Sequence, residues 1–383
     1  MSKRPKPFHT EIIASPKDFT PSSPEMEVIG AFNPGVTTIQ TPNGLETLLM
    51  LRVAEKYKGD ERKYIHLPFF EIPNEEGVPP VIGFDVYLIK NVKVYKKDVK
   101  LLPDDERCER TSRLRHISLP RIMRIDEKGI IKREQKPALY PIWEYERFGM
   151  EDFRITHMDG RYILTYVVPH RGFGVSTSIV ETEDFKDYKS LTEGNTPRPI
   201  RTGIKDIVIF PEKVSSPNST ETIREGEKIY AALIRPNAFA NLSVPGIWTS
   251  YSPDLIHWGQ EHRLTEEKIM AGTGSPPIKL ENIWFAPYHE TTILNKTEVK
   301  YDTKLMSVNA KEPWENFHSS DVLLTRSDYS EILPEKGYVP NVVFTSGMIE
   351  RKGITSLFSG IDDTYTVQDD FYTEDLIRFV NGK

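Results

Sequence analysis

The chain has 383 residues, a formal net charge of -6 at pH 7 and 28% charged residues of both signs. It can build a large core, and it lacks the basic excess of a nucleic-acid-binding protein. Cys108 is the only cysteine, which excludes an internal disulfide and a thiolate metal cluster. The N-terminal residues lack the apolar stretch of a signal peptide, and no apolar run is long enough to span a bilayer. We therefore expect a cytoplasmic protein without nucleic-acid or membrane partners.

Short apolar or alternating segments bounded by turn residues recur along the chain, whereas long helical periodicity is scarce. The expected strands, in chain order, are 47–55, 82–89, 161–168, 228–236, 246–252, 282–289, 303–310, 341–349 and 354–362. The Asp-Gly pair in "MDGR", from Met158 to Arg161, predicts a tight hairpin. At the C-terminus "YTEDLIRFVNG" predicts a short helix. Residues 1–30 are expected to form an extended N-terminal arm that is available for homo-oligomer contacts.

A weak internal repeat indicates how these strands are organised. "TEDFKDY" at 182–188 and "SPDLIHW" at 252–258 share a hydroxyl, an aspartate, an apolar residue and an aromatic ring at the same spacing, and each follows an expected strand. Several short strands with a recurring turn signature favour an all-β propeller. A large β-sandwich is the alternative. Because no composition shift marks a boundary, residues 31–383 are expected to form one catalytic domain.

The segment "MEDFRIT" carries adjacent carboxylates and an arginine, Glu151, Asp152 and Arg154. Neighbouring residues of a regular strand point to opposite faces, so only one carboxylate should face a pocket. This alternation predicts that Asp152 and Arg154 share the pocket face, with Glu151 as a supporting residue. The competing interpretation is a surface ion pair beside a hairpin.

Other charged residues interrupt or end apolar strands. They are Arg52, Lys205 with Asp206, Arg235 and His289. A buried charge is costly unless it is paired or faces a wet cavity, so together these residues indicate a polar central cavity. The histidines show no metal-ligand spacing, and no dinucleotide or Walker motif is present, so neither a metal nor a cofactor is expected. "GTGS" at 272–275 is interpreted as a turn.

The ordered set of short motifs resembles glycoside hydrolase family 130. The motifs are "FNPG", "LLMLRVAE", "RHISLPRIMRIDEKG", "MEDFRIT", "TEDF", "KDIVIFPEK", "IRPN", "GTGSPPI", "YHET", "VPNVVFTSG" and "SGIDDT", and they span nearly the whole chain. The resemblance implies a five-bladed β-propeller that cleaves β-mannosidic linkages with inversion. It also implies a small oligosaccharide substrate, and inorganic phosphate as co-substrate in those members that are phosphorylases.

Carried over residue by residue, the resemblance implies that Asp152 is the catalytic proton donor, acting through the O3 hydroxyl of the bound mannose. It implies phosphate-binding roles for Lys205 and Arg235, to which Arg171 is added because it lies close by. The residues implied or expected to bind the sugar are Arg52, Arg154, His289 and Asp363. The aromatic candidates for stacking on sugar rings are Trp143, Tyr145, Trp248 and Tyr288.

Three departures from the family pattern affect this interpretation. Phe153 stands where the family usually has proline, Ile234 replaces a histidine of the phosphate site, and Val175 replaces an arginine of some phosphorylases. We favour a phosphorylase that releases mannose 1-phosphate. An inverting β-mannosidase, with Asp206, Glu212 or Glu290 as candidate base, is the first alternative, and a glycan-binding propeller without turnover is the second.

Overall fold

The computed structural model describes residues 3–73, 75, 77–96, 98–101, 112–170, 174–191, 199–219, 223–236, 246–295 and 298–382. Over these residues the fold is all-β, with one α-helix and a few short 3-10 turns. In this part of the chain no helix has the length and apolar character needed to cross a membrane.

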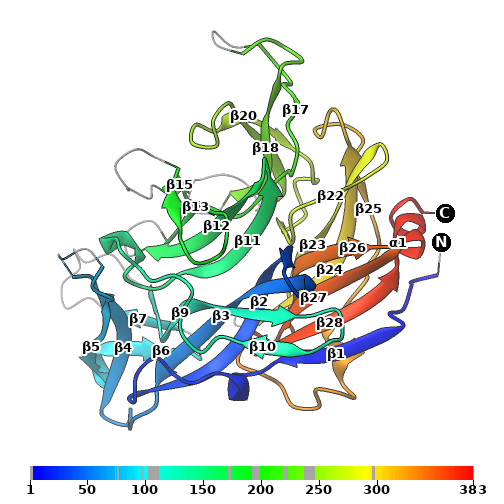
Figure 1. Cartoon of the computed structure of the whole chain (residues 1–383). Coiled ribbons are helices and arrows are strands. Elements are labelled where there is room, and N and C mark those ends of the chain that lie inside the picture. Colours follow the sequence, from blue (N-terminus) through cyan, green and yellow to red (C-terminus); the bar gives the residue numbers. More distant parts are fainter. Residues whose placement is uncertain are drawn as a thin grey trace.

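Five antiparallel sheets follow one another along the chain (Figure 1). The first sheet contains β2 (Met26–Thr41), β3 (Gly44–Tyr57), β9 (His116–Ile125) and β10 (Ile131–Arg133). The second contains β11 (Glu151–Met158), β12 (Arg161–His170), β13 (Gly174–Thr182), β14 (Lys189–Ser190) and β15 (Pro199–Thr202). The third contains β16 (Ile204–Ile209), β17 (Val214–Ser215), β18 (Lys228–Pro236), β19 (Trp248–Ser252) and β20 (Gly259–Arg263).

The last two sheets complete the series. The fourth contains β21 (Ala271–Thr273), β22 (Ile278–Leu280), β23 (Ile283–Ile293), β24 (Val299–Asn309) and β25 (His318–Ser319). The fifth contains β26 (Val343–Arg351), β27 (Ile354–Ile361), β28 (Tyr365–Tyr372) and, at its edge, the N-terminal strand β1 (His9–Ala14). Strand β2 packs beside both β11 and β26, so the first sheet contacts the second and the last.

Two small sheets are inserted between β3 and β9. One pairs β4 (Tyr64–Glu71) with β5 (Val81–Leu88). The other contains β6 (Val92–Val94), β7 (Asp98–Leu101) and β8 (Ser112–Leu114). The insertion reaches the loop before β26, because the Tyr338 hydroxyl donates to the Lys96 carbonyl at 3.0 Å.

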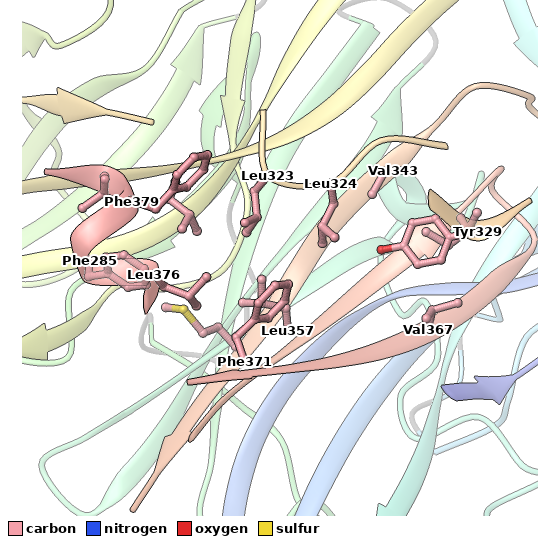
Figure 2. Close-up of a cluster of buried hydrophobic side chains, with 14 of the residues drawn as sticks. Phe285, Leu323, Leu324, Tyr329, Val343, Leu357, Val367, Phe371, Leu376 and Phe379 are labelled. Carbon is pink, nitrogen blue, oxygen red and sulfur yellow. The ribbon is translucent and has the colours of Figure 1, made fainter. Parts of the chain in front are cut away.

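Apolar side chains between neighbouring sheets form the core. Figure 2 shows one such cluster, in which Phe285 of β23 meets residues of β26 to β28 and of the helix α1 (Thr373–Val380). The helix buries Leu376, Phe379 and Val380, whose spacing of three and four residues places them on one face. Each such large apolar side chain stabilises the fold by about 1.5–3 kcal/mol.

The expected strands and the C-terminal helix are confirmed, since each predicted segment overlaps a strand and α1 covers the predicted helix. The predicted hairpin joins β11 to β12, and Asp159 and Gly160 have the positive φ angles of 51° and 76° that a two-residue turn requires. A boundary at residue 30 falls within β2, and β1 pairs with β28 instead of extending as an arm. The homo-oligomer contact stays a prediction.

Candidate active site

Irregular inner strands place polar side chains around a central cavity of about 160 Å³. The pairing of β2, β11 and β16 with their neighbours shifts register at Asn33, Asp152 and Asp206, and these three residues have φ angles of 47°, 52° and 55°. A bulge with one residue in the left-handed region re-aims the following side chains. Asparagine and aspartate tolerate that region better than most residues, which fits their presence here.

Most of the predicted site residues come together at this cavity. Its lining includes Asn33, Arg52, Leu114, His116, Glu151, Asp152, Val167, Val175, Lys205, Asp206, Arg235, His289, Val299, Tyr301, Val339, Val342, Phe344 and Asp363. Arg171 lies outside the described residues. Glu212 and Glu290 do not line the cavity and instead pair with Lys279 and Lys304.

The prediction that only one carboxylate of the pair faces the cavity is wrong. Both Glu151 and Asp152 line it, because the bulge interrupts the alternation on which the prediction depended. Arg52 bridges the two, donating from Nη2 to Glu151 Oε1 at 2.5 Å and from Nη1 to Asp152 Oδ1 at 3.1 Å. The guanidinium also contacts Ser118 Oγ at 3.0 Å and His116 Nε2 at 3.2 Å. Arg52 therefore clamps the bulge.

Asp152 is held as a carboxylate. Burial opposes its ionisation, but the charges of Arg52 and Arg154 and a 2.9 Å hydrogen bond from Asn33 Nδ2 outweigh burial and hold its pKa below the usual range. Arg154 was expected to face the cavity beside Asp152. Instead it lies buried next to the lining, donating to the carbonyls of Gly274 at 2.6 Å and Asp152 at 2.9 Å.

A second cluster contains the cationic groups. Arg235 Nη1 lies 3.3 Å from Asp206 Oδ2 and 3.0 Å from His289 Nε2. Burial, together with the charges of Arg235 and Lys205, lowers the pKa of His289 well below its ordinary value, so its imidazole is neutral near pH 7. Since arginine can only donate, Nε2 accepts and the proton sits on Nδ1, which has no hydrogen-bond partner among the described residues.

The lack of a side chain at Gly272 lets the Asp206, Arg235 and His289 side chains pack closely together. A methyl group at this position would come within 2.4 Å of His289 Cε1, 2.7 Å of Arg235 Cδ and 2.7 Å of Asp206 Oδ2. The "GTGS" segment, expected as a turn, thus begins within strand β21, where the missing side chain lets the cationic cluster pack against the backbone.

The departures from the family pattern have local structural explanations. Phe153 is fully buried and stacks on Tyr166 with ring centroids 4.8 Å apart. Ile234 packs in an apolar cluster and does not line the cavity, whereas Val175 does. The four aromatic residues proposed to stack on sugars are absent from the described lining of this cavity.

Sequence reasoning missed several lining residues. Asn33 could have been suspected from "FNPG", because asparagine is enriched at positive φ. His116, Tyr301 and Phe344 carried no signal beyond their place in apolar strands. In the described part of the chain, no group of three His, Cys, Asp or Glu residues is arranged to hold a metal ion.

Comparisons with known proteins identify the family of this chain. The profile of glycoside hydrolase family 130, described as beta-1,4-mannooligosaccharide phosphorylase, matches residues 116–381. A beta-1,2-mannobiose phosphorylase of Listeria innocua is 29% identical over 360 residues, covering 92% of this chain and 91% of that protein. A solved structure of a beta-1,2-mannobiose phosphorylase from Listeria innocua, in complex with beta-1,2-mannobiose, superposes with a TM-score of 0.78 at 26% identity, covering 96% and 97% of the two chains.

A more distant solved structure shares the fold. It comes from work on family 130 glycoside hydrolases that target beta-1,2 mannosidic linkages in Candida mannan, and it has a TM-score of 0.60 at 15% identity, covering 97% and 94% of the two chains.

Proposed function

The chain belongs to glycoside hydrolase family 130 and is an enzyme of that family, and we propose that it cleaves a β-1,2-linked mannobiose or short oligosaccharide by phosphorolysis with inversion. The names of its relatives support the substrate class and the use of phosphate. We also propose that the five sheets are the blades of a five-bladed β-propeller whose inner strands surround the site. The protein is proposed to act in the cytoplasm.

The main support for phosphorolysis is the group of basic side chains on one side of the cavity. Lys205 lines it beside Arg235 and the neutral His289. Within the described part of the chain Lys205 has no ion-pair partner, whereas Arg52 pairs with Glu151 and Asp152, and Arg235 pairs with Asp206. A dianion placed there would gain charge-assisted hydrogen bonds from Lys205 and favourable charge from Arg235. The residues present therefore suit phosphate as the attacking group.

The proposed reaction balances without an added acid. A phosphate oxygen attacks the anomeric carbon of the mannosyl unit as the bond to the glycosidic oxygen breaks on the opposite face, which inverts the configuration. Hydrogen phosphate loses its proton as it attacks, and the leaving glycosidic oxygen gains a proton, so the step is balanced. We propose that Asp152 transfers this proton to the leaving oxygen. A bound dianion would oppose the ionised state of Asp152 and raise its pKa, which suits a relay.

Product analysis tests the proposal. The protein is incubated with β-1,2-mannobiose, or with β-1,4-mannobiose, in the presence and absence of inorganic phosphate. We expect mannose 1-phosphate from the β-1,2 substrate only when phosphate is present. Release of two mannose molecules at the same rate in phosphate-free buffer would contradict the proposal.

A β-mannosidase is the second candidate, because two carboxylates other than Glu151 and Asp152 line the cavity, those of Asp206 and Asp363. Asp206 lines the cavity and could activate water as a base. It is occupied by the ion pair with Arg235, which makes this role less favourable. If hydrolysis is observed, Asp206→Asn should abolish it.

A further inference from the structure

A second cavity lies on the other face of the hairpin that carries Asp152. We call it the lateral pocket; it has a volume of about 710 Å³ and is bounded by Ile72, Val78, Tyr140, Trp143, Tyr166 and Tyr188, among other residues. On β12, Tyr166 faces this pocket and the next residue, Val167, faces the central cavity. Consecutive residues of a strand point to opposite faces, so one hairpin forms a wall of both cavities.

The lining of the lateral pocket differs in chemistry from that of the central cavity. Aromatic rings and aliphatic side chains form most of it, and the charged residues among its described lining are Glu75, Glu144 and Glu146. No lysine or arginine belongs to that described lining. Its volume lies within the range of about 300–1,000 Å³ that is typical of small-molecule sites.

One buried carboxylate holds the aromatic part of this pocket in place. Glu146 is 1% exposed and accepts a 2.6 Å hydrogen bond from the Tyr166 hydroxyl. Its other oxygen accepts the backbone amides of Ile142 at 2.9 Å and Trp143 at 3.2 Å. The indole N–H of Trp143 is buried and has no partner in the described part of the chain. Buried donors are normally paired, so this unpaired donor in a residue of the lining is unusual.

We propose that the lateral pocket is a second saccharide site, which binds an uncharged mannoside and excludes sugar phosphates. The apolar face of a sugar ring packs well on tyrosine and tryptophan rings, and carboxylates accept its hydroxyl groups. Glu144 pairs with the neighbouring Arg147, but the described lining itself contains no lysine or arginine that would donate charge-assisted hydrogen bonds to a phosphate ester. This goes beyond the proposed function, because the site would accept the substrate and reject the phosphorylated product.

Calorimetric titration tests the second site directly. β-1,2-Mannobiose is titrated, without phosphate, into the Asp152→Asn protein so that no turnover occurs. We expect two binding sites in this parent and one after the further change Trp143→Ala. Tyr372→Ala, which removes an exposed ring at the C-terminal end of β28, should leave both sites. Mannose 1-phosphate should bind once in every variant.

A second variant guards against misfolding of Trp143→Ala. Val78 is 44% exposed at the edge of the pocket, so Val78→Trp would fill the space without removing a buried side chain. It should weaken mannobiose binding at the second site at least about 10-fold. A single site in the parent protein, or two unchanged sites in both pocket variants, would overturn the proposal.

The same variants separate this proposal from the proposed function. In the protein with native Asp152, Trp143→Ala and Val78→Trp should each form mannose 1-phosphate within about 2-fold of the wild-type rate at low substrate. Failure of phosphorolysis would leave the titration result standing. A pocket variant that abolished turnover together with central-site binding would show that the two cavities are one site, and would overturn the second site.

Discussion

The central cavity and the lateral pocket share the β11–β12 hairpin but are built differently. The central cavity depends on bulges and on residues with positive φ, which bring Glu151 and Asp152 to one side. The lateral pocket uses regular alternation, so Tyr166 and Val167 separate to opposite faces. Irregular backbone therefore gathers charges of both signs, whereas the described lining of the lateral pocket combines aromatic rings with carboxylates and contains no lysine or arginine. Four experiments would break or sharpen this contrast.

The largest effect is expected from Asp152→Asn, which removes the central carboxylate and keeps its shape. Loss of a proton-transfer group should lower kcat for phosphorolysis by about 10²–10⁴-fold. Steady-state formation of mannose 1-phosphate measures it, and the thermal midpoint confirms folding. Full turnover in this variant would show that another group moves the proton.

Phe153→Ala removes a packed side chain from the β11–β12 hairpin, which separates the central cavity from the lateral pocket. Phe153 is fully buried and stacks on Tyr166, so its truncation should lower the free energy of unfolding by about 3–5 kcal/mol. Phe8 is 50% exposed and provides the matched control, for which a loss below about 1 kcal/mol is expected. Denaturant titration of both variants would refute this packing role if their losses were equal.

Lys205→Met should affect only the central cavity. A hydrogen bond to a charged group contributes about 1.5–3 kcal/mol, so the KM for phosphate should rise about 10-fold to 100-fold. Lys279→Met removes a lysine that pairs with Glu212 outside the cavity, and it should leave this constant unchanged. Initial rates over a range of phosphate concentrations provide the comparison. An equal rise in both variants would argue against a local phosphate contact.

The smallest effects are opposite pH dependences of stability. Burial lowers the pKa of His289 from 6.5, so the unfolded chain binds its proton first and stability is lost as pH falls below about 6.5. Burial raises the pKa of Glu146 from 4.5, so the native state keeps its proton longer and stability is lost as pH rises above about 4.5. The loss of stability at falling pH should be smaller in His289→Gln, and the loss at rising pH should be smaller in Glu146→Gln. Unfolding curves from pH 4.5 to 7.5 measure the slopes, and unchanged slopes would contradict these assignments.

Much of the fold could be predicted from the sequence, because alternation and turn residues are local signals. The segment 161–168 and the Asp159-Gly160 turn are examples. The pairing of β1 with β28 could not be predicted, since it joins residues such as Thr10 and Asp369 across nearly the whole chain. Two-residue strands such as β14 carry too little pattern to be recognised.

The candidate site was predictable in its residue types and not in its geometry. Charges within apolar strands identified Arg52, Lys205 and Arg235 as residues of one cavity. The shared position of Glu151 and Asp152 depends on a left-handed residue that the surrounding structure stabilises, and the local sequence did not reveal it. The prediction that Arg154 faces the cavity was wrong for the same reason, because the direction of its side chain follows from the bulge.

The edge position of β1 affects how the protein is made. The fifth sheet combines a strand from residues 9–14 with strands that lie within residues 343–372. During synthesis β1 therefore has no native partner strand until β28 has been made. Joining the two ends through a short linker and opening the chain elsewhere would make that strand pair local, and should speed the last step of folding.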